Sequence, residues 1–222
     1  MAVKWWVRHH PHVMVTQPVL ENSAADDFAL RPVGEHESYG CLVLNGELSP
    51  AKVGTAVTQI AACNHFEPEV EHGTCPKGPL SAFLNGLITM WALFAAAGFR
   101  VSDNTTGTVF VEPGCCNGPE TWRDWLEILE GTGFSYLGHD PSSVAERVGD
   151  VVRRLTLDAY TTDGSPVIEL PVDQVRMLVA DGQKDLRDYL SLAGAWAQPH
   201  RPAHAAAVTA ALARAWEPAL TP

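Results

Sequence analysis

The pattern of apolar and polar positions predicts that the chain begins with strands. Short runs of β-branched and aromatic residues are separated by Pro11, Pro18 and the turn-forming pair Asn45-Gly46. We therefore expect strands in four segments, residues 5–8, 12–16, 28–33 and 41–44.

Two helices are predicted next. Ser49 followed by Pro50 is a typical helix start, because serine caps the free N–H groups and proline suits the first helical position, and this helix is expected to end near Cys63. Residues 78–99 carry no charged side chain, and their length is close to the ~20 residues that a bilayer requires. Polar residues recur at every fourth position in this run. We therefore favour a buried helix that spans residues 79–97 and is capped by Gly98, rather than a membrane span.

The second half of the chain alternates between strand and helix patterns. Residues 99–101 and 108–112 are expected to form a hairpin, and 151–157 is expected to pair with 167–170 across a turn. Apolar residues at helical spacing predict three further helices, over residues 119–129, 171–196 and 204–216.

These elements predict an α+β fold in which antiparallel strands pack against about five helices. We expect a strand-rich lobe with two helices over residues 1–97, and a lobe with the hairpin and the C-terminal helices over 98–222. No linker rich in Pro, Gly or Ser separates the halves, so one continuous domain is the alternative.

Charge and cysteine content narrow the class of protein. The net charge of −11, with 26 acidic against 15 basic residues, argues against a nucleic-acid partner, because binding phosphates requires clustered Lys and Arg. The five cysteines are an odd number, which favours reduced thiols. No apolar signal segment is recognisable at the start, and we expect a cytoplasmic protein.

The most unusual residues are the neighbouring cysteines Cys115 and Cys116, placed between a predicted strand and a predicted helix. Free N–H groups at a helix start can lower the pKa of a thiol and make it nucleophilic. His139 is the nearest candidate for a general base. The favoured interpretation is structural, in which one cysteine fills the core and the other forms the turn with Gly114.

A second cluster could bind a metal ion. Cys63, His65, His72 and Cys75 could supply four nitrogen and sulfur ligands to tetrahedral zinc. Their spacing, C-x-H-x6-H-x2-C, matches no standard zinc signature, so an acidic loop between two helices is favoured. We predict no bound metal and no cofactor.

Three short patterns suggest a family resemblance. They are Pro-Gly-Cys-Cys at 113–116, Trp-Arg-Asp-Trp at 122–125 and Leu-Gly-His-Asp-Pro at 137–141. In these patterns the chain resembles a family of small actinobacterial proteins over roughly residues 98–196. The resemblance implies no particular activity.

Common enzyme signatures, such as phosphate-binding glycine loops and the nucleophile elbow, are missing from the sequence. We therefore expect a non-catalytic protein that binds another protein, encoded nearby, through Trp122, Arg123 and Trp125. It would be an accessory subunit of an actinobacterial biosynthetic enzyme or an immunity-like protein. The alternative is a small enzyme of natural-product biosynthesis that uses Cys115 or Cys116, or a metal near His65 and His72. A membrane role is the least favoured.

Overall fold

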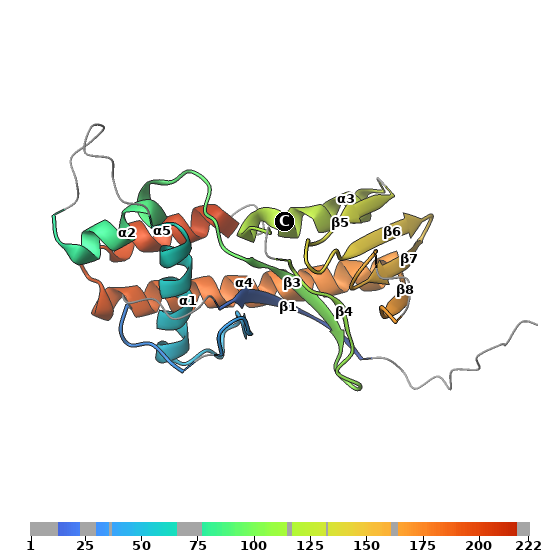
Figure 1. Cartoon of the computed structure of the whole chain (residues 1–222), viewed down its shortest axis with the longest axis horizontal. Coiled ribbons are helices and arrows are strands. Elements are labelled where there is room, and N and C mark those ends of the chain that lie inside the picture. The colour runs from blue at the N-terminus through green and yellow to red at the C-terminus, as the bar shows by residue number, and fades with distance from the viewer. Residues whose placement is uncertain are drawn as a thin grey trace, which may run out of the picture.

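The computed structural model describes residues 13–22, 30–35, 37–65, 77–114, 117–131, 133–160 and 164–216. Within these ranges the chain forms two four-stranded antiparallel sheets and five α-helices, so the predicted α+β class is confirmed (Figure 1).

The first sheet has the strand order β2-β1-β3-β4. Its strands are β1 (Met14–Glu21), β2 (Cys41–Val43), β3 (Ala97–Asp103) and β4 (Val109–Val111). The pairing of β3 with β4 confirms the predicted hairpin. Pro18 lies inside β1, where sequence reasoning expected it to end a strand. Proline is tolerated there because the edge of Pro18 that lacks an N–H donor faces Leu44, which lies just beyond the end of β2. On that same edge, the carbonyl of Pro18 accepts the N–H of Leu44.

The second sheet follows chain order, β5-β6-β7-β8. Its strands are β5 (Phe134–Tyr136), β6 (Val144–Val148), β7 (Val151–Thr156) and β8 (Val167–Pro171). The pairing of β7 with β8 confirms the prediction for that segment.

The helices are α1 (Pro50–Cys63), α2 (Pro79–Thr89), α3 (Asp124–Glu130), α4 (Val172–His200) and α5 (Ala205–Trp216), with a 3₁₀ helix η1 (Pro119–Arg123) before α3. The 29-residue α4 runs along the molecule and contacts β1 of the first sheet as well as β7 and β8 of the second (Figure 1). Buried side chains from both sheets and from all five helices form one hydrophobic cluster around it.

The prediction of one helix over residues 79–97 is wrong. The helix ends at Thr89, residues 90–96 form a loop, and Ala97 begins β3. Gly98 lies in the strand and caps no helix. The reason is tertiary: β3 pairs with β1 along all seven of its residues and alternates between buried and half-buried positions, which is strand periodicity. In the part of the chain that is described, no helix is both long and apolar enough to cross a membrane.

The strand predicted over residues 28–33 is also wrong for its described part. Residues 30–33 are irregular and pack against α1. The N–H of Leu30 bonds to the hydroxyl of Thr58, and the carbonyl of Pro32 lies so close to Gly54 that a Cβ there would be 1.8 Å from its oxygen. The backbone of this segment therefore bonds to and packs against α1 and does not pair with any described strand. The strand predicted over 5–8 lies outside the described residues.

Candidate functional site

The two tryptophans predicted to bind a partner belong to the core. Trp122 and Trp125 are each 2% exposed, in η1 and α3. Arg123 is half-buried, and its guanidinium lies over the Trp122 ring, 5.6 Å from the centroid. The prediction is therefore corrected for both indoles: their spacing on one helical face reflects packing, and they offer no surface to a partner.

The two loops that carry the thiol hypothesis meet in space. A Cβ on Gly114 would lie 1.8 Å from the carbonyl oxygen of His139, so the two backbones are in direct contact. The side-chain amide of Asn117 donates to the carbonyl of Leu137 at 2.8 Å and ties the loops together. Cys115 and Cys116 lie outside the described residues. The contact places exposed His139 next to Gly114, the residue before Cys115, and it is compatible with the thiol hypothesis and with a purely structural role alike.

The predicted metal cluster is described only in part. Cys63 is exposed at the end of α1, and the ring of His65 lies 5.6 Å from that of Phe83. His72 and Cys75 lie outside the described residues. Among the residues that are described, no three His, Cys, Asp or Glu side chains come together to hold a metal ion.

A thiol that sequence reasoning did not single out contacts two charged groups. Cys41 on β2 donates its S–H to the carboxylate of Glu112 at 3.3 Å, and Glu112 forms an ion pair with Arg100 on β3. Burial raises the pKa of Cys41 to about 11, and the hydrogen bond to Glu112 adds to this rise, although Arg100 opposes it. The thiol is therefore protonated at neutral pH and is a weak nucleophile.

Ser81 on α2 and His204, the residue just before α5, form a hydroxyl–imidazole pair. The Ser81 Oγ lies 3.2 Å from the His204 Nε2. The other ring nitrogen of His204, Nδ1, is buried without a hydrogen-bond partner in the described structure. Catalytic serine–histidine pairs rely on a third group that orients the imidazole, and no described residue bonds the Nδ1 of His204 in that way. The pair links α2 to the start of α5.

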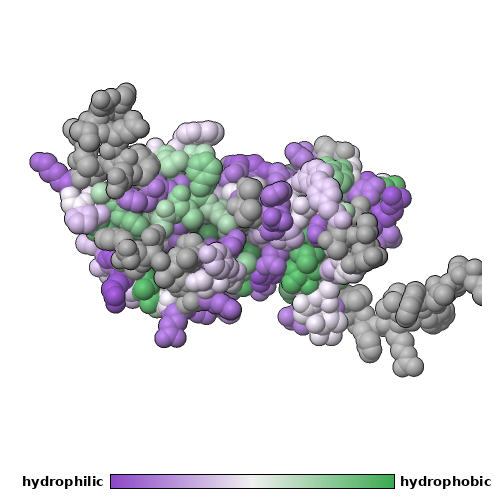
Figure 2. All heavy atoms as spheres, in the orientation of Figure 1, coloured by the Kyte–Doolittle hydropathy of each residue, from purple (hydrophilic) through white to green (hydrophobic). Residues whose placement is uncertain are grey.

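An exposed tryptophan and an exposed phenylalanine lie close together in residues 90–95, which we call the aromatic loop. Trp91 is 90% exposed and Phe94 is 65% exposed, whereas Leu93 between them is buried. Half-buried Met90 and Ile88 continue the apolar surface onto α2. Figure 2 shows hydrophobic residues gathered over the same end of the molecule, where α2 and α5 lie.

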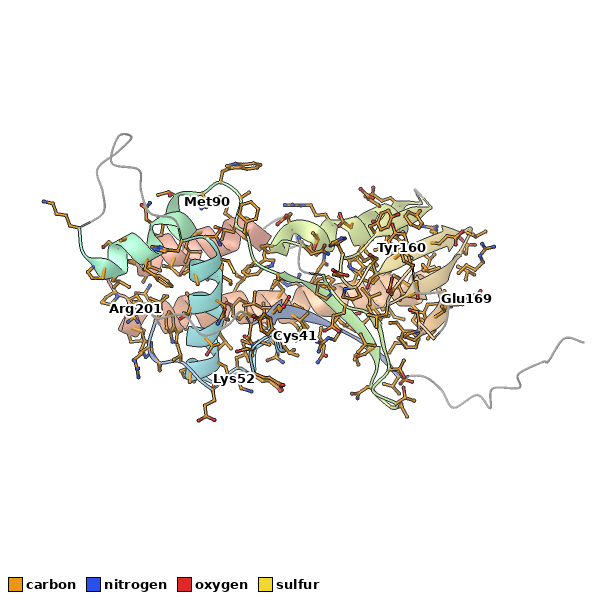
Figure 3. All side chains as sticks on the ribbon, in the orientation of Figure 1. Cys41, Lys52, Met90, Tyr160, Glu169 and Arg201 are labelled. Atoms are coloured by element: carbon orange, nitrogen blue, oxygen red, sulfur yellow. The ribbon has the colours of Figure 1, made fainter. Side chains whose placement is uncertain are left out.

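The backbone of the aromatic loop is held at both ends. Near its start, the Arg214 guanidinium donates to the carbonyls of Ile88 and Met90 at 3.3 and 3.1 Å (Met90 is labelled in Figure 3). Near its end, the side-chain amide of Asn64 bonds both backbone groups of Phe94: its Nδ2 donates to the carbonyl at 2.7 Å, and its Oδ1 accepts the N–H at 2.8 Å. Asn64 is 2% exposed and caps the end of α1. An ordered backbone thus presents two aromatic side chains to water.

A second group of exposed aromatic side chains lies on β5 of the second sheet and on the segment after β7. Phe134 and Tyr136 pack edge to face with ring centroids 5.0 Å apart, and the Tyr136 hydroxyl lies 3.5 Å from that of Tyr160. Glu146 on β6 and Arg153 on β7 form an ion pair in the same sheet. Strand β6 is the neighbour of β5. This surface is more polar than the aromatic loop.

No family model, curated protein or solved structure matches this chain. The candidate site accordingly rests on the geometry of the aromatic loop.

Proposed function

We propose that this protein is a non-catalytic binding protein that docks onto another protein through the aromatic loop. The observation that carries the proposal is the exposure of Trp91 and Phe94 on a backbone clamped by Asn64 and Arg214. Large exposed apolar groups are unfavourable in water unless a partner covers them, and tryptophan is enriched among the residues that dominate binding energy. A backbone that is already ordered loses little further entropy on binding.

Two further observations support a binding role over catalysis. The Cys41 thiol is kept protonated, and within the described part of the chain no group bonds the Nδ1 of His204 to orient its imidazole. The net charge of −11 favours a partner with a basic surface, which would also speed association. Within this proposal the protein acts in the cytoplasm, either as an accessory subunit of a biosynthetic enzyme or as an immunity-like protein, and its partner is encoded nearby.

The test compares two double variants of the full chain. Trp91→Ala/Phe94→Ala removes the side chains of the aromatic loop, and Phe134→Ala/Tyr160→Ala removes a matched pair of exposed aromatics on the second sheet. Each is titrated against purified products of the neighbouring genes. Because a central aromatic contact contributes about 2 kcal/mol or more, the first variant should lose at least about 30-fold in affinity while the second stays near the original value. Equal affinities for both variants would remove the aromatic loop as the docking site.

The thiol alternative is compatible with the contact between Gly114 and His139 and is tested by its own variant. Cys115→Ser/Cys116→Ser leaves the aromatic loop untouched. The binding proposal expects this variant to keep full affinity for the partner. Loss of a chemical turnover by the isolated chain, with the fold preserved, would favour the enzyme instead.

A further inference from the structure

Strand β2 lies at the edge of the first sheet as the described residues define it. It pairs with β1, and no other described strand lies on its outer side. The N–H of Asn22 bonds the carbonyl of Gly40, and the N–H of Leu44 bonds the carbonyl of Pro18. Because backbone groups along an antiparallel strand alternate in direction, the N–H and C=O groups of Cys41 and Val43 point away from β1. No hydrogen bond between described residues uses any of these four groups.

The structure is hollowed beside this strand. A hollow of about 440 Å³ lies between β2 and the start of α1, and it is lined by Cys41, Leu42 and Val43 on one side and by Leu48, Ser49 and Lys52 on the other. A second hollow of about 210 Å³ continues it and shares Cys41, Leu42 and Lys52. Cys41 and Lys52 are labelled on the corresponding elements in Figure 3. Three residues of an added strand would span about 10 Å, which is the length of β2.

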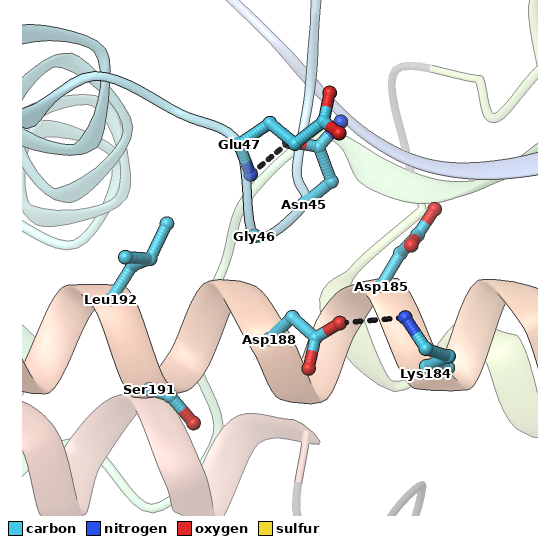
Figure 4. Close-up of a pocket in the computed structure, with 8 residues that line it drawn as sticks. All are labelled: Asn45, Gly46, Glu47, Lys184, Asp185, Asp188, Ser191 and Leu192. Carbon is cyan, nitrogen blue, oxygen red and sulfur yellow. Dashed lines mark hydrogen bonds and ion pairs between the residues drawn. The ribbon is translucent and has the colours of Figure 1, made fainter.

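The charged side chains that line these hollows are mostly acidic. Glu35 and Glu37 line the smaller hollow, and Glu47 lines the larger one, against a single lysine among their lining residues, Lys52. Beyond Glu47 a third hollow of about 560 Å³ opens against α4, where Lys184 is already paired with Asp188 at 2.9 Å (Figure 4). The carboxylates along this path outnumber the amines, so the site favours positive charge.

We propose that the open edge of β2 accepts an extended, positively charged peptide segment of another protein as an additional strand. The free backbone groups of Cys41 and Val43 would supply the hydrogen bonds, and the acidic walls would select Lys or Arg side chains at the ends of the segment. A second copy of this chain is a poorer occupant, because two molecules that each carry a charge of −11 repel one another. The site is separate from the aromatic loop, so neither proposal depends on the other.

The probe is the synthetic peptide acetyl-Lys-Val-Thr-Val-Lys-amide, added to the full isotope-labelled chain and followed by NMR. The amides of Cys41 and Val43 should exchange quickly with solvent in the free protein, and should shift and become protected when peptide is added. Two control peptides should each bind at least about threefold more weakly, one with both lysines replaced by glutamate, and one N-methylated at the threonine, which removes a strand donor. Absence of any shift at millimolar peptide, or equal binding of all three peptides, would overturn the proposal.

Protein variants locate the site. Val43→Pro removes the N–H that points away from β1 but keeps the bonds of Gly40 and Leu44 to β1, and it should weaken binding about tenfold. Glu47→Gln leaves the backbone intact and should weaken binding about threefold, whereas Glu169→Gln on the distant β8 should change nothing. Unchanged binding by the first two variants would place the peptide elsewhere. If, without any peptide, the protection of both amides grows with protein concentration, the occupant is a second copy of this chain. That result would refute the peptide proposal.

Discussion

Replacing Asn64 should release the aromatic loop and destabilise the protein at the same time. The side chain of Asn64 makes three hydrogen bonds: its Nδ2 donates to the carbonyls of Ile60 and Phe94 at 2.6 and 2.7 Å, and its Oδ1 accepts the N–H of Phe94 at 2.8 Å. These bonds join the end of α1 to a segment 30 residues further along the chain. In Asn64→Ala all three are lost.

The magnitude follows from the number and burial of these bonds. A typical intramolecular hydrogen bond contributes about 1 kcal/mol net, so three lost bonds at a residue that is 2% exposed should lower the free energy of unfolding by roughly 3 kcal/mol. Asn64→Asp keeps the size of the side chain and the acceptor for Phe94, but it places a carboxylate oxygen against two carbonyls. We expect it to be at least as destabilising as Asn64→Ala at pH 7, although its volume is conserved.

Urea denaturation of both variants measures the change in free energy, and hydrogen exchange at the Phe94 amide measures the state of the loop. That amide should be protected in the original chain and exchange rapidly in Asn64→Ala. Asn104→Ala, at an exposed turn position, is the control and should stay within about 0.5 kcal/mol of the original. If Asn64→Ala unfolds as the control does, or if the Phe94 amide is equally protected in both, the clamp does not hold the loop.

Two further predictions test the packing of α4 and the environment of α3. In Gly182→Ala the new Cβ would meet side chains of β1 and β3 at 3.0 and 3.2 Å, so thermal or urea unfolding should show a net loss of about 1–2 kcal/mol despite better helix propensity. Gly194→Ala on the same helix has a nearest contact of 3.4 Å and should gain about 0.5–1 kcal/mol; a gain in both variants would contradict the close approach of α4 to the first sheet. Burial and the neighbouring Glu127 raise the pKa of Asp124 from 3.8 to about 6. The folded state therefore binds the Asp124 proton more tightly than the unfolded state does, and the free energy of unfolding falls as the pH rises from about 4 to 6. Asp124→Asn should therefore be more stable than the original by about 1 kcal/mol at pH 7, after allowance for solvent screening, and equal to it near pH 3.5; an advantage that persists at the lower pH would show that ionisation is not its cause.

Sequence signals correctly predicted the elements whose formation depends on residues close together in the chain. Helix α1 begins and ends where the sequence predicted, because Ser49 accepts the N–H of Lys52 and Pro50 occupies the first turn. The β3–β4 and β7–β8 pairs followed from turn residues between two β-prone runs. Capping and turn formation involve residues a few positions apart, and a single sequence displays such neighbours directly.

The apolar run over residues 78–99 shows where local signals are insufficient. Hydrophobicity is the same property in a buried helix, an exposed loop and a sheet strand, and the run contains part of all three. Only the pairing of β3 with β1 decides that the end of this run, from Ala97 onward, is a strand. The same limit applies to Trp122 and Trp125, because a tryptophan that fills a core and one that binds a partner look alike in sequence.

By itself, the sequence determined the α+β class, most helix positions, the two hairpin pairings and the acidic character of the surface. The tertiary structure alone decided which aromatic side chains reach water and what holds them there. The aromatic loop depends on Asn64 and Arg214, the latter 124 residues away from Met90 along the chain, and the open edge of β2 depends on which strand lies beside it. Contacts between residues so far apart are created by chain folding and have no local signature, so the candidate sites became visible only in three dimensions.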